Sequence, residues 1–224
     1  MADAGHETGA VKVVFYGDSI VDGWKAISSP ERRWSTLVSE QLGWDELNVS
    51  RGGMGFVRWR SASRGEDGRR LHSADELGLL ADVLDSDADA CVVALGGNDQ
   101  MLLREDRLSG EDRWRPLIAH AIERDLRMIV ERFGAENTVV LDLYTWWAEG
   151  EESPGWRAAR ELLVGGGAVH GLDLVPGLRT PLVARPELLG ADGIHPNDDG
   201  HAALAASVLP HLAHALGRDF SPEE

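Results

Sequence analysis

The chain has 224 residues and a mass of 24.4 kDa, and its 43% hydrophobic and 27% charged residues are typical of a soluble globular domain. Its formal net charge of −16 and its pI of about 4.8 exclude nucleic acid and anionic membrane surfaces as partners, because both would repel it. The N-terminal residues lack the basic and apolar regions of a signal peptide, and no apolar stretch is long enough for a bilayer, so we expect a cytoplasmic protein without membrane insertion.

The first half of the chain predicts alternating strands and helices. Val11–Tyr16 is a continuously apolar run and predicts a buried strand, and Glu31–Leu42 has helical spacing and ends at Gly43. Leu47–Ser50 predicts a second strand. Residues 51–70 are irregular and hold six arginines, and Leu71–Leu84 again shows helical spacing.

The second half continues the alternation. Ala90–Leu95 and Thr138–Leu143 predict strands, and Trp114–Phe133 between them has the clearest helical periodicity. Residues 165–190 are apolar but broken by Gly and Pro, and a final helix is expected from Asn197 to about Leu216, kinked or interrupted at Pro210.

This order predicts an α/β fold with a doubly wound parallel sheet. Both faces of such a sheet are covered by helices, which explains why the strands are apolar throughout. We expect one domain over residues 11–217, a flexible N-terminus over 1–10 and an acidic tail over 218–224. Cys91 is the only cysteine, so it cannot form an intrachain disulfide, and it reads as a small core residue.

Polar clusters stand at four places where ligands bind in α/β proteins, outside the carboxyl ends of the strands. Three of them follow predicted strands, and the fourth precedes the last helix. They read "GDS" at 17–19, "NVSRGG" at 48–53, "GGND" at 96–99 and "DGIH" at 192–195. We expect them to meet at one edge of the sheet.

The chemistry that these residues offer is acyl transfer. Ser19 can attack a carbonyl once His195 removes its proton, and Asp192, three residues before the histidine, can orient the imidazole. The oxyanion needs preorganised donors, for which we expect the N–H groups of Ser19 and Gly53 and the amide of Asn98.

Three of the four clusters also have a plain structural interpretation. Ser19 is a good helix cap, "GGND" a common turn, and "DGIHPND" a loop that leads into a helix with Pro196 at its first position. Their coincidence at consecutive strand ends favours a shared function.

A P-loop does not fit the glycine spacing around Ser19. His211 and His214 share a helix face, but their place near the helix end explains them without a metal.

The four motifs resemble the blocks of the SGNH hydrolases, also called GDSL-type esterases, in the same order and over nearly the whole chain. The resemblance implies a flavodoxin-like three-layer α/β/α fold with about five parallel strands. It also implies hydrolysis of a small-molecule ester through an acyl-serine, with no metal and no organic cofactor. The second block is the loosest match: Ser50 stands where the family often has glycine, and Gly52 competes with Gly53 for the oxyanion position.

The substrate is predicted less sharply than the reaction. Small or carbohydrate-borne acyl esters, acetyl esters included, are the first expectation; a thioesterase, a lysophospholipase and a non-catalytic binding module are the alternatives. Trp24, Trp146 and Trp147 are candidate wall residues, with core packing as the alternative.

Arg58 is a candidate for binding an anionic group of the substrate. The alternative is pairing with Glu66, Asp67 or the acidic run 82–89. Residues 165–190 would form a wall or lid over the site, or a surface loop packed on itself.

Overall fold

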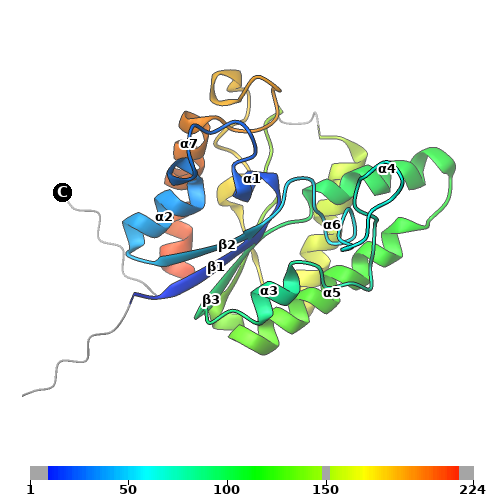
Figure 1. The fold of residues 1–224 in the computed structure, drawn as a ribbon, viewed down its shortest axis with the longest axis horizontal. Coiled ribbons are helices and arrows are strands. Elements are labelled where there is room, and N and C mark those ends of the chain that lie inside the picture. Colours follow the sequence, from blue (N-terminus) through cyan, green and yellow to red (C-terminus); the bar gives the residue numbers. More distant parts are fainter. Residues whose placement is uncertain (1–9, 148–151, 217–224) are drawn as a thin grey trace, which may run out of the picture.

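In the computed structural model, which describes residues 10–147 and 152–216, a parallel sheet separates two layers of helices (Figure 1). The strands are β1 (Lys12–Gly17), β2 (Asp45–Ser50), β3 (Ala90–Ala94), β4 (Thr138–Leu141) and β5 (Leu174–Val175). The helices are α1 (Ser19–Asp22), α2 (Trp34–Leu42), α3 (Leu80–Leu84), α4 (Gln100–Ser109), α5 (Trp114–Phe133), α6 (Pro154–Val169) and α7 (Asp198–Ala215). The expected α/β/α architecture with five parallel strands is confirmed.

The strands lie in the order β2-β1-β3-β4-β5, and every neighbouring pair is parallel. The chain first builds outward to β2 and then crosses back to β3 on the other side of β1. This reversal creates a crevice outside the carboxyl ends of β1 and β3, which is where doubly wound sheets bind ligands. The loops that follow these two strands carry Ser19 and Asn98.

Residues of β1 alternate between the two faces of the sheet. Val14 and Tyr16 belong to the core beneath α5 and α6, whereas Val13 and Phe15 belong to the core beneath α2 and α7. All four side chains are fully buried, which explains why this strand is apolar throughout instead of alternating.

Several predicted elements differ from the observed ones. The helix expected over Leu71–Leu84 is limited to α3, because Gly78 has a φ of +57° and lies against the carbonyl of Arg60. The helix α7 continues through Pro210 without interruption, and its buried face packs against α2. Helices α4 and α6 and strand β5 were not predicted, and α6 takes up the first five residues of the expected 165–190 loop.

The expected N-terminal segment 1–10 falls outside the described residues apart from residue 10, and the tail 218–224 falls outside them entirely. The boundaries of the single domain, residues 11–217, therefore remain a prediction. Within the described helices, none combines the length and apolar character that a membrane crossing requires.

A fully buried ion pair ties the arginine-rich segment to α5. The guanidinium of Arg60 lies 2.6 Å from Asp125 Oδ2, and both side chains are completely inaccessible to solvent. Arg124 donates to the other carboxylate oxygen, and Arg60 also donates to the Tyr16 hydroxyl. The pair fixes residues 51–60 against the helical layer, close to the crevice.

Replacing Asp125 with alanine should lower the free energy of unfolding by about 3–5 kcal/mol, because Arg60 would stay buried without its carboxylate. The matched control is Glu131→Ala, which breaks the exposed pair with Arg127 on the same helix and should cost less than about 1 kcal/mol. Urea unfolding of both variants measures the difference. Equal losses would show that the buried pair does not stabilise the fold.

Candidate active site

Ser19 is the first residue of α1 and sits directly beyond the buried end of β1. The preceding residue, Asp18, caps the helix by accepting a hydrogen bond from the backbone N–H of Ile20. The N-cap role considered for Ser19 from the sequence therefore belongs to Asp18. Ser19 is 8% exposed, and its hydroxyl reaches the crevice.

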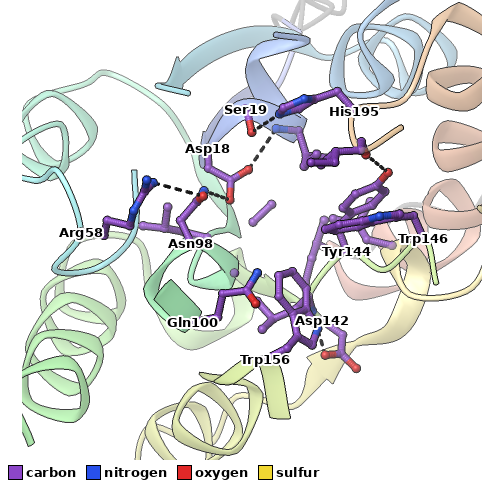
Figure 2. Close-up of a pocket in the computed structure, with 18 of the residues that line it drawn as sticks. Asp18, Ser19, Arg58, Asn98, Gln100, Asp142, Tyr144, Trp146, Trp156 and His195 are labelled. Atoms are coloured by element: carbon purple, nitrogen blue, oxygen red, sulfur yellow. Dashed lines mark hydrogen bonds between the residues drawn. The ribbon is translucent and has the colours of Figure 1, made fainter. Parts of the chain in front are cut away.

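His195 lies in the loop before α7, and its Nε2 is 2.9 Å from Ser19 Oγ (Figure 2). Its Nδ1 is 2.6 Å from Asp192 Oδ2. The structure thus brings together the three residues predicted from the first and last motifs. This geometry fixes the tautomer of the imidazole, with Nδ1–H toward the carboxylate and Nε2 toward the serine.

The loop that carries His195 is held by its own backbone and by one tyrosine. Gly190 N–H donates to the carbonyl of His195, and the hydroxyl of Tyr144 donates to the carbonyl of Ile194 at 2.7 Å. Asn197 caps α7 through its side chain, which accepts from Gly200 N–H. These bonds place the imidazole before any substrate binds.

Asp192 is suited to stay ionised over a wide pH range. Partial burial acts to raise its pKa, but hydrogen bonds from the His195 side chain and from the N–H groups of Ile194 and His195 outweigh it and lower the pKa to about 2. A negative charge therefore remains beside Nδ1 at every pH at which the protein is expected to work.

Asn98 links the third motif to the first and second. Its Nδ2 donates to Asp18 Oδ2 at 3.0 Å and to the carbonyl of Met54 at 3.1 Å, and its Oδ1 faces Arg58 Nη1 at 3.4 Å. Both amide hydrogens thus already have acceptors. The N–H of Ser19, in contrast, has no hydrogen-bond acceptor among the described residues.

The second motif lies beside the crevice, and a buried carboxylate shapes the loop that follows it. Asp99 accepts hydrogen bonds from the N–H groups of Phe56, Val57 and Arg58. Gly53 has a φ of +76° and packs against the ring of Trp59, so only glycine fits there without strain. It does not line the cavity, and its role as an oxyanion donor stays a prediction.

A cavity of about 310 Å³ opens next to Ser19 and His195. Its walls are mostly apolar and come from the ends of β3 and β4 and the starts of α4 and α6. The side chains that line it away from the proposed catalytic groups include Leu95, Gln100, Met101, Leu143, Trp146, Trp156 and Leu178.

The predicted wall residues divide into two groups. Trp146 and Arg58 line the cavity, whereas Trp24 and Trp147 do not. Trp24 lies 41% exposed against Gly52, and Trp147 packs edge-on against Trp146 and Trp156 from behind. From the predicted wall or lid at 165–190, Leu178 forms part of the wall.

Tyr144, Gln100 and Trp156 line the cavity but were not predicted from the sequence, and Asp18 was named only as part of the first motif, without a role. Asp18 and Gln100 stand one and two residues from predicted site residues, so closeness to a motif was an available signal. No such signal marked Trp156. Among the described residues, no group of three or more His, Cys, Asp or Glu side chains is arranged to hold a metal ion.

Comparison with known proteins agrees with these motifs and with this fold. A model of the GDSL-like lipase/acylhydrolase family matches residues 15–203. A GDSL lipase from Mycobacterium tuberculosis is 56% identical over 34 residues, a stretch that spans only 15% of this chain and 15% of that relative.

Solved structures show a similar fold at low sequence identity. A family two carbohydrate esterase from Cellvibrio japonicus has a TM-score of 0.64 and 16% identity, over 92% of this chain and 62% of that chain. A carbohydrate acetylesterase from Sinorhizobium meliloti has a TM-score of 0.58 and 18% identity, over 91% of this chain and 99% of the other. At these identities the likeness is one of fold.

The ionisation of Asp18 gives a testable pH dependence. Burial raises its pKa from 3.8 to about 6, so between these values the folded chain holds a proton that the unfolded chain has released. Stability is therefore lost as pH rises through this window. Asp18→Asn cannot ionise at this position. Its free energy of unfolding, relative to that of the wild type, should therefore rise by about 2–3 kcal/mol from pH 4 to pH 7. Urea unfolding at both pH values tests this, and a constant difference would contradict it.

Proposed function

Because the chain belongs to the GDSL-like lipase/acylhydrolase family, we propose that it is a serine esterase that works through an acyl-serine intermediate. The observation that carries the proposal is the unbroken series of contacts from Ser19 Oγ through His195 to Asp192, at 2.9 Å and 2.6 Å. This arrangement supports nucleophilic attack by a hydroxyl whose proton has an acceptor in place.

The first half of the proposed reaction is acylation. As Ser19 Oγ attacks the ester carbonyl, its proton passes to His195 Nε2, and the Asp192 carboxylate stabilises the imidazolium through Nδ1–H. The imidazolium then gives this proton to the departing alcohol oxygen, which leaves the acyl group on Ser19. In the second half, water attacks the acyl carbon with His195 again as base, and Ser19 regains its proton.

The developing oxyanion would lie beside the start of α1. The unused N–H of Ser19 is one donor, and we propose Gly53 N–H and Asn98 Nδ2 as the others. For Asn98 the proposal has a specific requirement: the amide must exchange one of its present acceptors, Asp18 or the Met54 carbonyl, for the oxyanion.

We propose small or carbohydrate-borne acyl esters, acetyl esters among them, as substrates. Two neighbours in fold are named as carbohydrate esterases, and aromatic walls such as Trp146 suit sugar rings and acyl groups alike. The cavity of about 310 Å³ is on the order of ten times the volume of a water molecule in the liquid. An acetyl group would fill only part of it, so the cavity supports a longer acyl group or part of the alcohol as well.

Arg58 supports the proposal that the substrate carries an anionic group. Its guanidinium lines the cavity, stacks over Trp59 at 3.6 Å and donates to the carbonyl of Gly53. No described carboxylate lies within 4.0 Å of its guanidinium as an ion-pair partner. Asp67, one of the partners considered from the sequence, pairs with Arg69 instead. A carboxylate or phosphate on the substrate would supply this partner.

Ser19→Ala should lower kcat for p-nitrophenyl acetate by a factor on the order of ten thousand, because no nucleophile remains. A fluorophosphonate probe should label the wild type and the control variant Ser109→Ala, which changes an exposed serine at the end of α4, but not Ser19→Ala. Wild-type protein that neither hydrolyses esters nor reacts with the probe would instead indicate a ligand-binding module.

Arg58→Ala should lower kcat/KM for an anionic ester, such as a hemisuccinate, about tenfold more than for a neutral ester of the same length. The extra loss corresponds to one charge-assisted contact. The matched control is Arg51→Ala, which removes a neighbouring arginine that does not line the cavity and should affect both esters alike. Equal losses in Arg58→Ala would remove the anionic substrate from the proposal.

A further inference from the structure

Most polar side chains around the cavity already have protein partners. Asp18 accepts from Ile20 and Asn98, and the hydroxyl of Tyr144 donates to the carbonyl of Ile194. Asp142 is held by Arg160 through two of its guanidinium nitrogens. Such groups shape the wall and have little capacity left for a ligand.

Gln100 differs, because only one end of its amide is used. Its Oε1 accepts from Ser153 Oγ at 3.1 Å, and the same Oγ accepts from Trp156 N–H as the cap of α6. The structure places Oε1 of Gln100 at this hydroxyl, so the hydroxyl is the donor and Nε2 is the end of the amide that Ser153 leaves unused. No described residue accepts a hydrogen bond from Nε2, so both of its N–H groups are available.

The position of Gln100 is fixed by close packing between α4 and α6. A methyl group at Gly155 would come within 2.7 Å of the backbone oxygen of Gln100, so the two helix starts touch directly. The bond from Ser153 holds the side chain as well. The amide is consequently preorganised, which lowers the entropic cost of binding a ligand.

Gln100 faces the cavity from the side opposite Ser19 and His195 (Figure 2). The rest of the cavity lining is mostly apolar and aromatic, with Leu95, Leu143 and Trp156 among its side chains. A substrate group that runs from Ser19 across the cavity would therefore pass an apolar section and end at a donor.

We propose that Gln100 is a specificity-determining residue that donates a hydrogen bond from Nε2 to an oxygen at the far end of the bound substrate group. The substrate class is then an ester with an apolar body that carries a keto, hydroxyl or ether oxygen several bonds from the scissile carbonyl. This inference rests on the proposed esterase function and adds the polar end of the substrate to it. The oxygen belongs to the acyl group or to the alcohol, according to which of them occupies the cavity.

Two pairs of esters distinguish these sources. In the acyl pair, p-nitrophenyl hexanoate is compared with the analogue that has a keto group on the penultimate carbon. In the alcohol pair, hexyl acetate is compared with the corresponding keto-hexyl acetate. The wild type should prefer the keto member of one pair by about five- to tenfold in kcat/KM, the effect of one additional hydrogen bond.

Variants of Gln100 should abolish this preference. Gln100→Met keeps the length of the side chain without a donor and should bring the ratio close to one. Gln100→Glu keeps the oxygen that Ser153 bonds but replaces the donor with a second acceptor, so it should reverse the ratio. The matched control is Met101→Leu, which changes the next cavity residue without a change in polarity and should keep the wild-type ratio.

Failure of this inference is distinguishable from failure of the esterase proposal. Wild-type protein that hydrolyses the plain esters but shows no keto preference in either pair would overturn the role of Gln100 alone. A preference that persists in Gln100→Met would also overturn it. If neither pair is hydrolysed and Ser19 does not react with a fluorophosphonate, the esterase proposal itself fails.

Discussion

The contact between Ser19 Oγ and His195 Nε2 joins two residues that are 176 positions apart, and the fold is arranged so that they meet. Ser19 is placed by β1, which lies between β2 and β3 in the sheet. His195 is placed by the loop that enters α7. The histidine loop in turn depends on Tyr144 from the end of β4. Elements from the beginning, middle and end of the chain thus determine one distance of 2.9 Å.

Packing between α2 and α7 supports the start of α7, which follows the loop that carries His195. The backbone N–H of Trp34 at the start of α2 donates to Nδ1 of His201, which is buried one turn into α7. Burial lowers the pKa of His201 to about 4, so the imidazole stays neutral and remains an acceptor. A movement of α7 would break this bond and displace His195 with it.

The sequence predicted β1, β3, β4 and the long helix α5 well, because burial on both faces or along one stripe leaves a clear apolar pattern. It did not predict α4, which buries only Leu102, Leu103 and Asp106, or α6, whose buried face consists largely of Gly and Ala. The helix expected over Leu71–Leu84 was wrong because Gly78 and the buried Arg60 impose a different backbone path. Two-residue strands such as β5 leave no pattern to read.

The candidate site likewise contains residues that the sequence predicted and residues that it did not. Ser19, Asn98, Asp192 and His195 could be predicted because they follow strand ends or precede a helix, where topology brings them together. Gln100 could not, since its importance lies in the unused end of an amide whose other end is bonded by Ser153. Trp24 and Trp147 were assigned to the cavity from sequence proximity alone, but their rings pack elsewhere.

The most direct test of the account is a double-mutant cycle on the hydroxyl and the imidazole. kcat/KM for one activated ester would be measured for the wild type, for Ser19→Ala, for His195→Ala and for the double variant. If the two side chains act as one unit, each single change removes nearly all of the activity, and the double variant is no slower than either single one. Losses that multiply in the double variant would show that the two groups act independently, and would contradict the account.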